Sequence, residues 1–261
     1  MRQEAYFCTV KELDELGKNN IPRQLISHTH LIYSSPATLA FNSPGAEGFG
    51  VKRAGLAVPD SVMLIVSPGC CGRNTSVLSS MRAYQDRFYY LLMDETDIVT
   101  GRHLKKIPKA VAEICEGLKK KPSVVMICIT CVDALLGTDM ERVCHKAEEY
   151  AGVPVRPCYM YALTREGRKP PMVHVRQSVY SLLEPKKKKG NVVNLLGYFS
   201  PLTDDCELYD LLHGAGVKTI HEISRCKDYA QYQTMSEANF NLVLHPEARF
   251  AAEAVSYTHL R

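Results

Sequence analysis

Cysteine is the residue type in this sequence that is most able to do chemistry, with ten among 261 residues. Cys70 and Cys71 follow the short apolar segment 61–67 (SVMLIVS), and Cys131 follows the segment 123–130 (SVVMICIT). Thiolates are soft ligands for metal ions and also take part in redox reactions. Because reducing compartments keep thiols from pairing, ten cysteines in a chain without a secretion signal indicate metal or redox chemistry more than a disulfide framework.

The order of apolar and amphipathic segments indicates the elements that position these cysteines. Segments 61–67 and 123–130 are apolar almost throughout, which is typical of buried strands. Between them lies a predicted helix, which ends at the lysines 119–121 and Pro122. Its apolar residues recur at helical spacing, at Ile107, Ala110, Val111, Ile114 and Leu118. A second predicted helix begins at Thr138 or Asp139 and ends at Gly152, and residues 153–155 open a third strand.

This β-α-β-α-β order predicts an α/β fold of the Rossmann-like, doubly wound kind, with a parallel sheet covered on both faces. The carboxyl ends of parallel strands meet at one edge of the sheet, where ligands bind in such folds. Cys71 and Cys131 are therefore expected at the same edge. A helix that starts just after each cysteine would lower the thiol pKa toward the thiolate that binds metal. We predict both cysteines as metal ligands.

A second α/β unit is expected after the lysines at 186–189. Its predicted strands are 191–197, 217–220 and 239–245, and its predicted helices are 204–213, 228–238 and 247–254. The predicted organisation is a cysteine-bearing α/β domain at 1–185, a solvated lysine-rich linker at 186–190, and a second, incomplete Rossmann-like domain at 191–254. Residues 255–261 (VSYTHLR) resemble the translated read-through of a sequencing-library adapter, so we expect a truncated protein.

The remaining cysteines are expected to be packing residues in most cases, because buried cysteine is common. Cys128 forms a C-x-x-C with Cys131, but it lies inside a predicted strand and its side chain is expected in the core. Cys8, near the N-terminus, is a weaker candidate ligand. The others fall within or beside predicted helices and strands, at Cys115, Cys144, Cys158, Cys206 and Cys226.

Composition excludes several classes of protein. With 46% hydrophobic and 23% charged residues the chain can bury a core, which excludes wholesale disorder. Its formal charge of +4 is spread along the chain, without the basic stripe that indicates nucleic acid as a partner. The apolar runs at 62–66 and 124–129 are too short to span a membrane, so we expect a cytoplasmic protein. The sequence also has no G-x-x-x-x-G-K-[ST] motif for hydrolysing nucleotide through a P-loop.

Three motifs, in order along the chain, resemble the nitrogenase component 1-like oxidoreductase family. They are 67–71 (SPGCC), 94–101 (DETDIVTG) and 129–139 (ITCVDALLGTD). The first resembles the family's cluster-binding G-P-x-G-C turn, and its cysteine ligand matches Cys71. The second resembles E-x-D-I-V-x-G. The third resembles S-T-C-x-x-x-L-I-G-D-D, in which Cys131 matches a second ligand.

The resemblance implies an iron–sulfur cluster at the interface of a dimer. The dimer would be a homodimer or a heterodimer with a paralogous component 1-like subunit, and a separate ATP-hydrolysing iron protein would donate electrons. The family's first cluster cysteine would fall at 41–43 (FNS), which has no thiol. We therefore expect a [4Fe–4S] cluster shared across the dimer, for which two thiolates per chain suffice.

In this arrangement Cys71 and Cys131 are the ligands and Cys70 is a substitute ligand, while Gly69 and Gly72 let the backbone approach the cluster closely. The leading interpretation is a component 1-like subunit of an ATP-dependent two-component reductase, with substrate and catalytic residues unknown. Its rivals are a non-catalytic scaffold for metallocluster assembly, a structural zinc protein using Cys70, Cys71, Cys128 and Cys131, and a metal-free protein with a Rossmann-like crevice.

Overall fold

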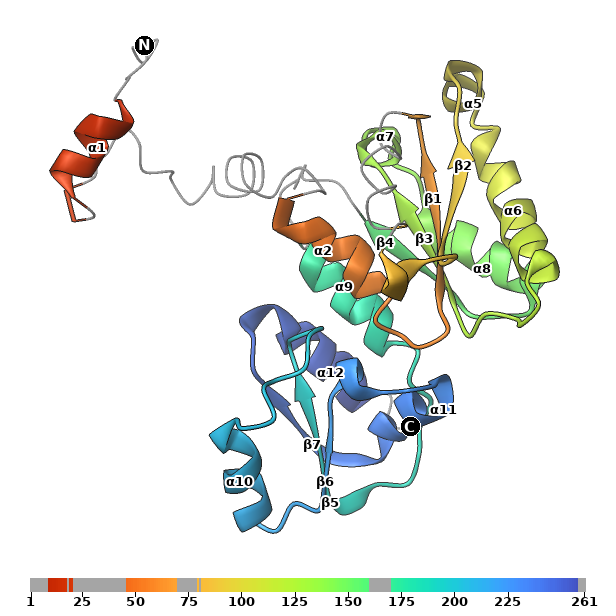
Figure 1. Ribbon diagram of the computed structural model, residues 1–261. Coiled ribbons are helices and arrows are strands. Elements are labelled where there is room, and N and C mark those ends of the chain that lie inside the picture. Colours follow the sequence, from red (N-terminus) through yellow and green to blue (C-terminus); the bar gives the residue numbers. More distant parts are fainter. Residues whose placement is uncertain are drawn as a thin grey trace.

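The computed structural model describes residues 9–17, 19–20, 46–69, 79, 81–159 and 170–257. Two parallel β-sheets follow one another along the chain, and helices pack against each of them (Figure 1). A short helix, α1 (Val10–Leu16), precedes both sheets. Among the described residues, no helix is both long enough and apolar enough to span a membrane.

The first sheet has four strands in the order β2-β1-β3-β4, and all neighbouring strands are parallel. They are β1 (Val62–Ser67), β2 (Phe88–Leu92), β3 (Val125–Ile129) and β4 (Val155–Tyr159). Every residue of β1 and β3 is buried, which explains their continuous apolar sequences. The predicted α/β fold and both of these buried strands are confirmed.

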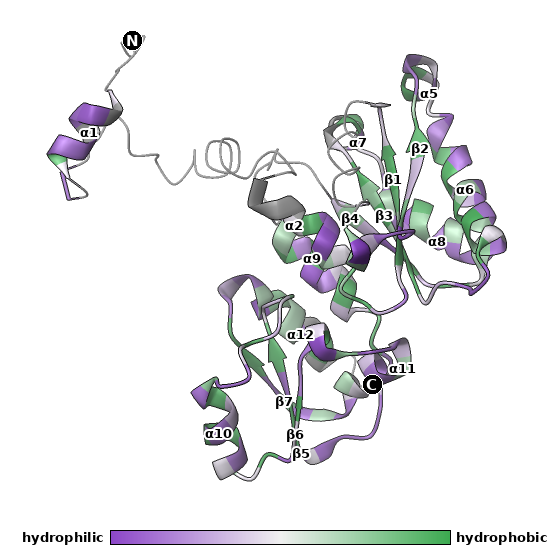
Figure 2. Ribbon diagram, viewed as in Figure 1, coloured by the Kyte–Doolittle hydropathy of each residue, from purple (hydrophilic) through white to green (hydrophobic). Residues whose placement is uncertain are grey.

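Helices cover both faces of the first sheet. Alternate residues of β1 and β3 face opposite sides, and each side has its own apolar cluster. One face packs against α6 (His103–Gly117) and α8 (Met140–Ala151), and the other against α2 (Ala46–Gly55) and α9 (Pro171–Tyr180). Figure 2 shows the hydrophobic strands enclosed between helices that mix polar and apolar residues.

Local signals set the ends of these helices. Asp139 caps α8, since its side chain accepts a hydrogen bond from the backbone N–H of Arg142, and Gly152 ends α8 with a positive φ of 62°. Two further helices follow strands of this sheet, α5 (Glu95–Thr100) after β2 and α7 (Cys131–Leu136) after β3. Within the described residues, the 3-10 segments are η3 (Arg82–Tyr84), η4 (Ile223–Arg225), η5 (Thr234–Glu237) and η6 (Pro246–Ala248).

The second sheet has three parallel strands in the order β6-β5-β7. They are β5 (Lys189–Leu196), β6 (Thr219–His221) and β7 (Ala238–Val243). The helices of this unit are α10 (Glu207–Gly214), α11 (Tyr229–Gln233) and α12 (Arg249–Tyr257). The predicted division into domains at 1–185 and 191–254 stays a prediction, as does the adapter origin proposed for 255–261.

Three details differ from the sequence analysis. Strand β2 was not predicted because it is an edge strand with a half-buried pattern, in which Tyr90 and Leu92 are exposed. Lys189 is not part of a linker but opens β5, where it forms an ion pair with Glu237. The helix expected at 228–238 is shorter, because α11 passes into the 3-10 segment η5.

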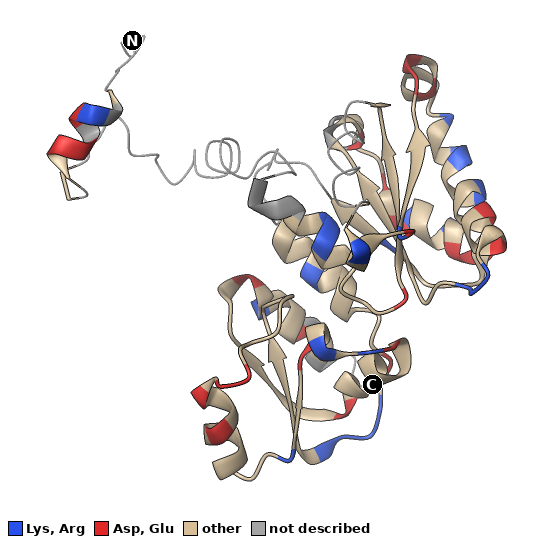
Figure 3. Ribbon diagram, in the orientation of Figure 1, with Lys and Arg blue, Asp and Glu red and all other residues tan. Residues whose placement is uncertain are grey.

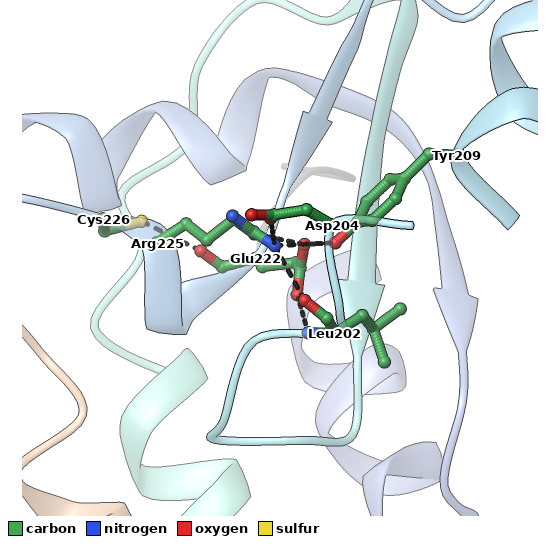
Figure 4. A network of polar contacts seen from close by, with 6 residues as sticks. All are labelled: Leu202, Asp204, Tyr209, Glu222, Arg225 and Cys226. Carbon is green, nitrogen blue, oxygen red and sulfur yellow. Dashed lines mark hydrogen bonds and ion pairs between the residues drawn. The ribbon is translucent and has the colours of Figure 1, made fainter. Parts of the chain in front are cut away.

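Lys and Arg positions are interspersed with Asp and Glu positions along the ribbons of both units (Figure 3). A polar network lies at the end of β6, where Glu222 is buried while Asp204 and Arg225 are exposed (Figure 4). Arg225 donates to Asp204 Oδ1 at 2.7 Å and to Glu222 Oε1 at 3.0 Å, and Tyr209 donates to the same Glu222 carboxylate. Glu222 also accepts from the backbone N–H of Leu202 at 3.0 Å. The network links the loop after β5 to the end of β6.

Arg176 of α9 joins the two units. Its guanidinium donates two hydrogen bonds to the backbone oxygen of Gly197, at 2.7 and 3.0 Å, directly after β5. It also contacts Glu247 Oε2 at 2.7 Å and lies over the ring of Phe199, with 5.1 Å between guanidinium carbon and ring centre. Because Arg176 is buried, these contacts replace its hydration and hold α9 against the second sheet.

We expect Arg176→Met to lower the free energy of unfolding by about 3 kcal/mol, because it leaves a buried carbonyl without its charged donor. Urea unfolding measures the change. Arg249→Met is the control. Arg249 is 81% exposed, and its ion pair with Glu253 is long, at 3.8 Å. Removing this exposed ion pair should lower the free energy of unfolding by less than about 0.5 kcal/mol. Equal effects of the two substitutions would contradict the role given to Arg176.

Candidate functional site

The carboxyl ends of β1 and β3 define the candidate site. The two strands are parallel neighbours, with Val66 paired to Ile129 at their last shared position. The chain passes from β1 to β2 on one side and then returns across β1 to β3 on the other, so the strand order reverses between β1 and β3. Such a switch point opens a crevice at the carboxyl ends of the strands, where α/β folds bind ligands.

The predicted cysteine sites lie at this edge as far as the described backbone reaches. Cys131 is the first residue of α7, directly after β3, and Figure 1 shows α7 beside the end of β1. Gly69, two residues after β1, is exposed, and the space that a Cβ would fill there is open. Cys70, Cys71 and Gly72 lie outside the described residues, as do Cys8 and residues 41–43. The ligand roles of Cys70, Cys71 and Cys131 and the backbone roles of Gly69 and Gly72 therefore stay predictions.

Two buried hydroxyl groups lie at the same edge without a hydrogen-bond partner. Ser67 ends β1 and is 0% exposed, and Thr130 follows β3 and is 2% exposed. Ser67 Oγ and Thr130 Oγ1 have no hydrogen bond in the described structure. An unsatisfied buried hydroxyl costs about 1–3 kcal/mol, so the edge has unused capacity to bind a polar group.

A buried contact between His103 of α6 and Asp133 of α7 holds α7 in place. His103 Nε2 lies 2.9 Å from Asp133 Oδ1, and both side chains are almost fully buried. His103 Nδ1 donates to the backbone oxygen of Asp97 at 3.0 Å, because a carbonyl can only accept. Thr138 Oγ1 donates to the same oxygen of Asp133 at 3.2 Å. The pair thus ties the start of α6 to the first turn of α7, which begins at Cys131.

Asp97 links this pair to α5. Asp94 and Asp97 form a capping box at the start of α5, and the side chain of Asp97 is buried. Its carboxylate accepts a hydrogen bond from Lys106 Nζ at 2.6 Å and lies 3.4 Å from Arg102 Nε. The hydrogen bond from Lys106 holds the pKa of Asp97 below its ordinary value. The segment 94–101 thus has a structural role beside the candidate site.

The remaining described cysteines lie away from this edge. Cys128 faces the core beside Cys158, its partner in the β3–β4 pairing. The hydrogen bond with Cys128 and burial raise the pKa of the Cys158 thiol well above its ordinary value, and its Sγ donates to the backbone oxygen of Val51 at 3.4 Å. Burial also raises the pKa of Cys144. Cys115, Cys206 and Cys226 are half-buried. The zinc site proposed with Cys128 thus loses one of its four ligands to the core.

Within the described side chains, no group of three or more His, Cys, Asp and Glu residues is arranged to hold a metal ion. The sequence analysis missed His103, Asp133, Ser67 and Thr130 as site residues. For Ser67 and Thr130 the sequence offers one weak indication, which is that they end the two apolar segments that precede the cysteines. His103 and Asp133 are 30 residues apart, and nothing in the sequence pairs them.

We expect His103→Phe to lower the free energy of unfolding by about 3–5 kcal/mol, because it leaves the buried carboxylate of Asp133 without its main partner. Urea unfolding measures this loss. His145→Ala is a matched control, because His145 is 74% exposed and makes only an i,i+4 contact with Glu149. A loss for His103→Phe no larger than the control's would contradict the account.

Lys106→Met tests the linkage of Asp97 to pH. The folded-state pKa of Asp97 is depressed, so its contribution to stability is present at neutral pH and is lost as the pH falls through that pKa. Without Lys106 the pKa rises, and we expect the midpoint of acid unfolding to move to higher pH. Lys105→Met, an exposed neighbour on α6, should leave the midpoint unchanged.

Comparison with known proteins identifies the family. The family model for nitrogenase component 1 type oxidoreductases matches residues 47–258. Among curated proteins, the chain is 28% identical over 176 residues to the nitrogenase iron-molybdenum cofactor biosynthesis protein NifE of Rhizobium meliloti, covering 65% of this chain and 37% of the relative. It is 26% identical over 222 residues to NifE of Klebsiella pneumoniae, covering 77% of this chain and 48% of the relative.

The fold also matches a solved structure, that of nitrogenase Cp1 at pH 6.5, with a TM-score of 0.61 and 16% sequence identity. That match covers 81% of this chain and 51% of the other. At this identity the likeness shows the fold alone. The chain spans less than half the length of the two curated relatives. Since the family model covers most of the sequence, the chain belongs to the nitrogenase component 1 type oxidoreductase family.

Proposed function

We propose that the protein containing this chain holds an iron–sulfur cluster at the switch point between β1 and β3. The observation that supports the proposal most is the adjacency of the two strand ends, with Cys131 after one and the Cys70–Cys71 segment after the other. In open α/β sheets, ligands bind outside the carboxyl ends of the strands where the strand order reverses, which is the position of this edge. In this chain the residues that follow both strands include thiols, which are the usual ligands of such clusters.

The donor set at this edge suits the cluster. Cys71 and Cys131 would hold it, with Cys70 as a substitute ligand, and Gly69 and Gly72 would let the backbone approach. The hydroxyls of Ser67 and Thr130, which have no hydrogen-bond partner in the described structure, could donate to a buried, negatively charged cluster. When bound, a [4Fe–4S] cluster supplies one-electron transfer. The chain's own residues position it, since the His103–Asp133 pair fixes the first turn of α7.

We further propose a component 1-like subunit of a two-component reductase as the function of the whole protein. Family membership supports this proposal. The protein would form a homodimer or a heterodimer with a paralogous subunit, and it would receive electrons from an ATP-hydrolysing iron protein. Its substrate is not specified by any residue described. We also propose a cytoplasmic location, because that compartment is reducing and the six cysteines that the structure describes as free would stay unpaired there.

A second function, as a scaffold for metallocluster assembly, is favoured by a separate observation. The curated relatives are named as proteins of iron-molybdenum cofactor biosynthesis. Both functions use the same cluster-binding edge, and they differ in whether the protein turns over a substrate. Substrate reduction with a cognate iron protein and ATP would support the reductase. Transfer of a metallocluster to an acceptor protein, without such reduction, would support the scaffold.

Metal analysis of the complete protein, purified without oxygen, tests the cluster itself. We expect about four irons and four sulfides per dimer, as for one shared [4Fe–4S] cluster. Cys71→Ser and Cys131→Ser should remove both, because each takes away a thiolate ligand. Cys115→Ser on α6 is the control, since this half-buried thiol lies outside the site. Zinc without sulfide, or a metal-free folded dimer, would contradict the proposal.

A further inference from the structure

We infer that the hydroxyl groups of Ser67 and Thr130 donate hydrogen bonds to sulfur atoms of the cluster bound at this edge, and so set its reduction potential. The inference rests on the proposed function. It concerns two residues of this chain that the cysteine motifs do not include.

The two hydroxyls lie side by side in the first sheet. Val66 of β1 pairs with Ile129 of β3, and Ser67 and Thr130 occupy the next position along each strand. Because side chains alternate along a strand, Ser67 shares a face with Ile65, and Thr130 shares a face with Cys128. Both of these residues belong to the apolar cluster under α2 and α9. Ser67 is the last residue of β1 and Thr130 directly follows β3, so the alternation would place both hydroxyls on the same face, at the ends of neighbouring strands.

Their lack of a partner is unusual within the described structure. Five serine and threonine side chains are fully buried there. Ser61, Ser178 and Ser236 each donate to a backbone oxygen, at 2.7, 2.9 and 2.8 Å. The other two, Ser67 and Thr130, have no partner, and both lie at the switch point. Ser224 in η4, a half-buried residue of the second unit, also has a hydroxyl without a hydrogen bond, but it has no such neighbour. Since buried polar groups are nearly always hydrogen-bonded, two adjacent exceptions indicate a bound group that is their partner.

Local backbone does not use these hydroxyls. Thr130 and Asp133 have the T-x-x-D spacing of a capping box, in which Thr130 Oγ1 would accept from the helix backbone. Instead Thr130 Oγ1 accepts nothing, and the Asp133 side chain is engaged by His103 and Thr138. The threonine hydroxyl at the start of α7 is therefore not used by the helix backbone.

Sulfur is the partner that this position favours. Cys131 directly follows Thr130, and the Cys70–Cys71 segment begins three residues after Ser67. Cluster sulfides and thiolates accept hydrogen bonds, and each such bond favours the reduced, more negative cluster. Donation by both hydroxyls therefore raises the reduction potential of the cluster.

A redox titration of the complete protein, purified without oxygen and followed by electron paramagnetic resonance, tests the inference. Thr130→Val keeps the shape of threonine but removes the hydroxyl, and Ser67→Ala does the same for serine. We expect both to shift the midpoint potential to more negative values. Thr130→Ser retains a hydroxyl and should stay close to wild type. Ser178→Ala removes a buried hydroxyl that already has a backbone partner, and it should leave the potential unchanged.

Iron and sulfide content, measured on every sample, separates the outcomes. If Thr130→Val and Ser67→Ala both bind the cluster and have the same midpoint potential as the wild-type protein, this inference is overturned and the proposed function is left intact. A wild-type protein without iron and sulfide overturns both. Cluster loss in Thr130→Val and Ser67→Ala, with retention in Thr130→Ser and Ser178→Ala, supports a hydroxyl contact with the cluster. Cluster loss in Ser178→Ala as well would show a general packing defect and contradict the inference.

Discussion

The parallel pairing of β1 with β3 is the constraint on which the rest of this structure depends. Continuous apolar sequence buries both strands on two faces, so their polar neighbours collect where the strands end. The strand order reverses between them, which makes this edge a topological switch point, and α/β folds of this kind bind ligands at such points. Cys131 begins directly at the end of β3, and the segment with Cys70 and Cys71 begins near the end of β1. The proposed cluster site is thus a consequence of topology combined with the residue types placed there.

Rigidity around this edge comes from buried polar contacts with few alternatives. His103 is held between the Asp97 carbonyl and the Asp133 carboxylate, so its ring links α5, α6 and α7. On the other face, one apolar cluster runs from the first sheet through α9 to the second unit, where Arg176 closes the junction. The buried hydroxyls of Ser67 and Thr130 at this edge have no hydrogen-bond partner in the described structure.

Sequence reasoning succeeded where burial is complete and local signals are strong. The buried strands β1 and β3, the amphipathic helices α6 and α8, and the caps Asp139 and Gly152 all followed from periodicity and end residues. It failed for β2, because the exposed Tyr90 and Leu92 interrupt the apolar pattern of a buried strand. It also failed for Lys189, which pairs with Ala238 of β7, because this long-range pairing cannot be predicted from the local sequence. The His103–Asp133 contact joins residues from two helices, so no local pattern encodes it. The missing hydrogen-bond partners of Ser67 and Thr130 can be recognised only from the three-dimensional structure, because they depend on the positions of all neighbouring groups.

The most direct test of the central claim is anomalous diffraction at the iron edge, from crystals of the complete protein grown without oxygen. The account predicts an iron peak at the carboxyl ends of β1 and β3, with the sulfur atoms of Cys71 and Cys131 as ligands. An iron peak elsewhere in the chain, or a zinc peak in its place, would contradict it.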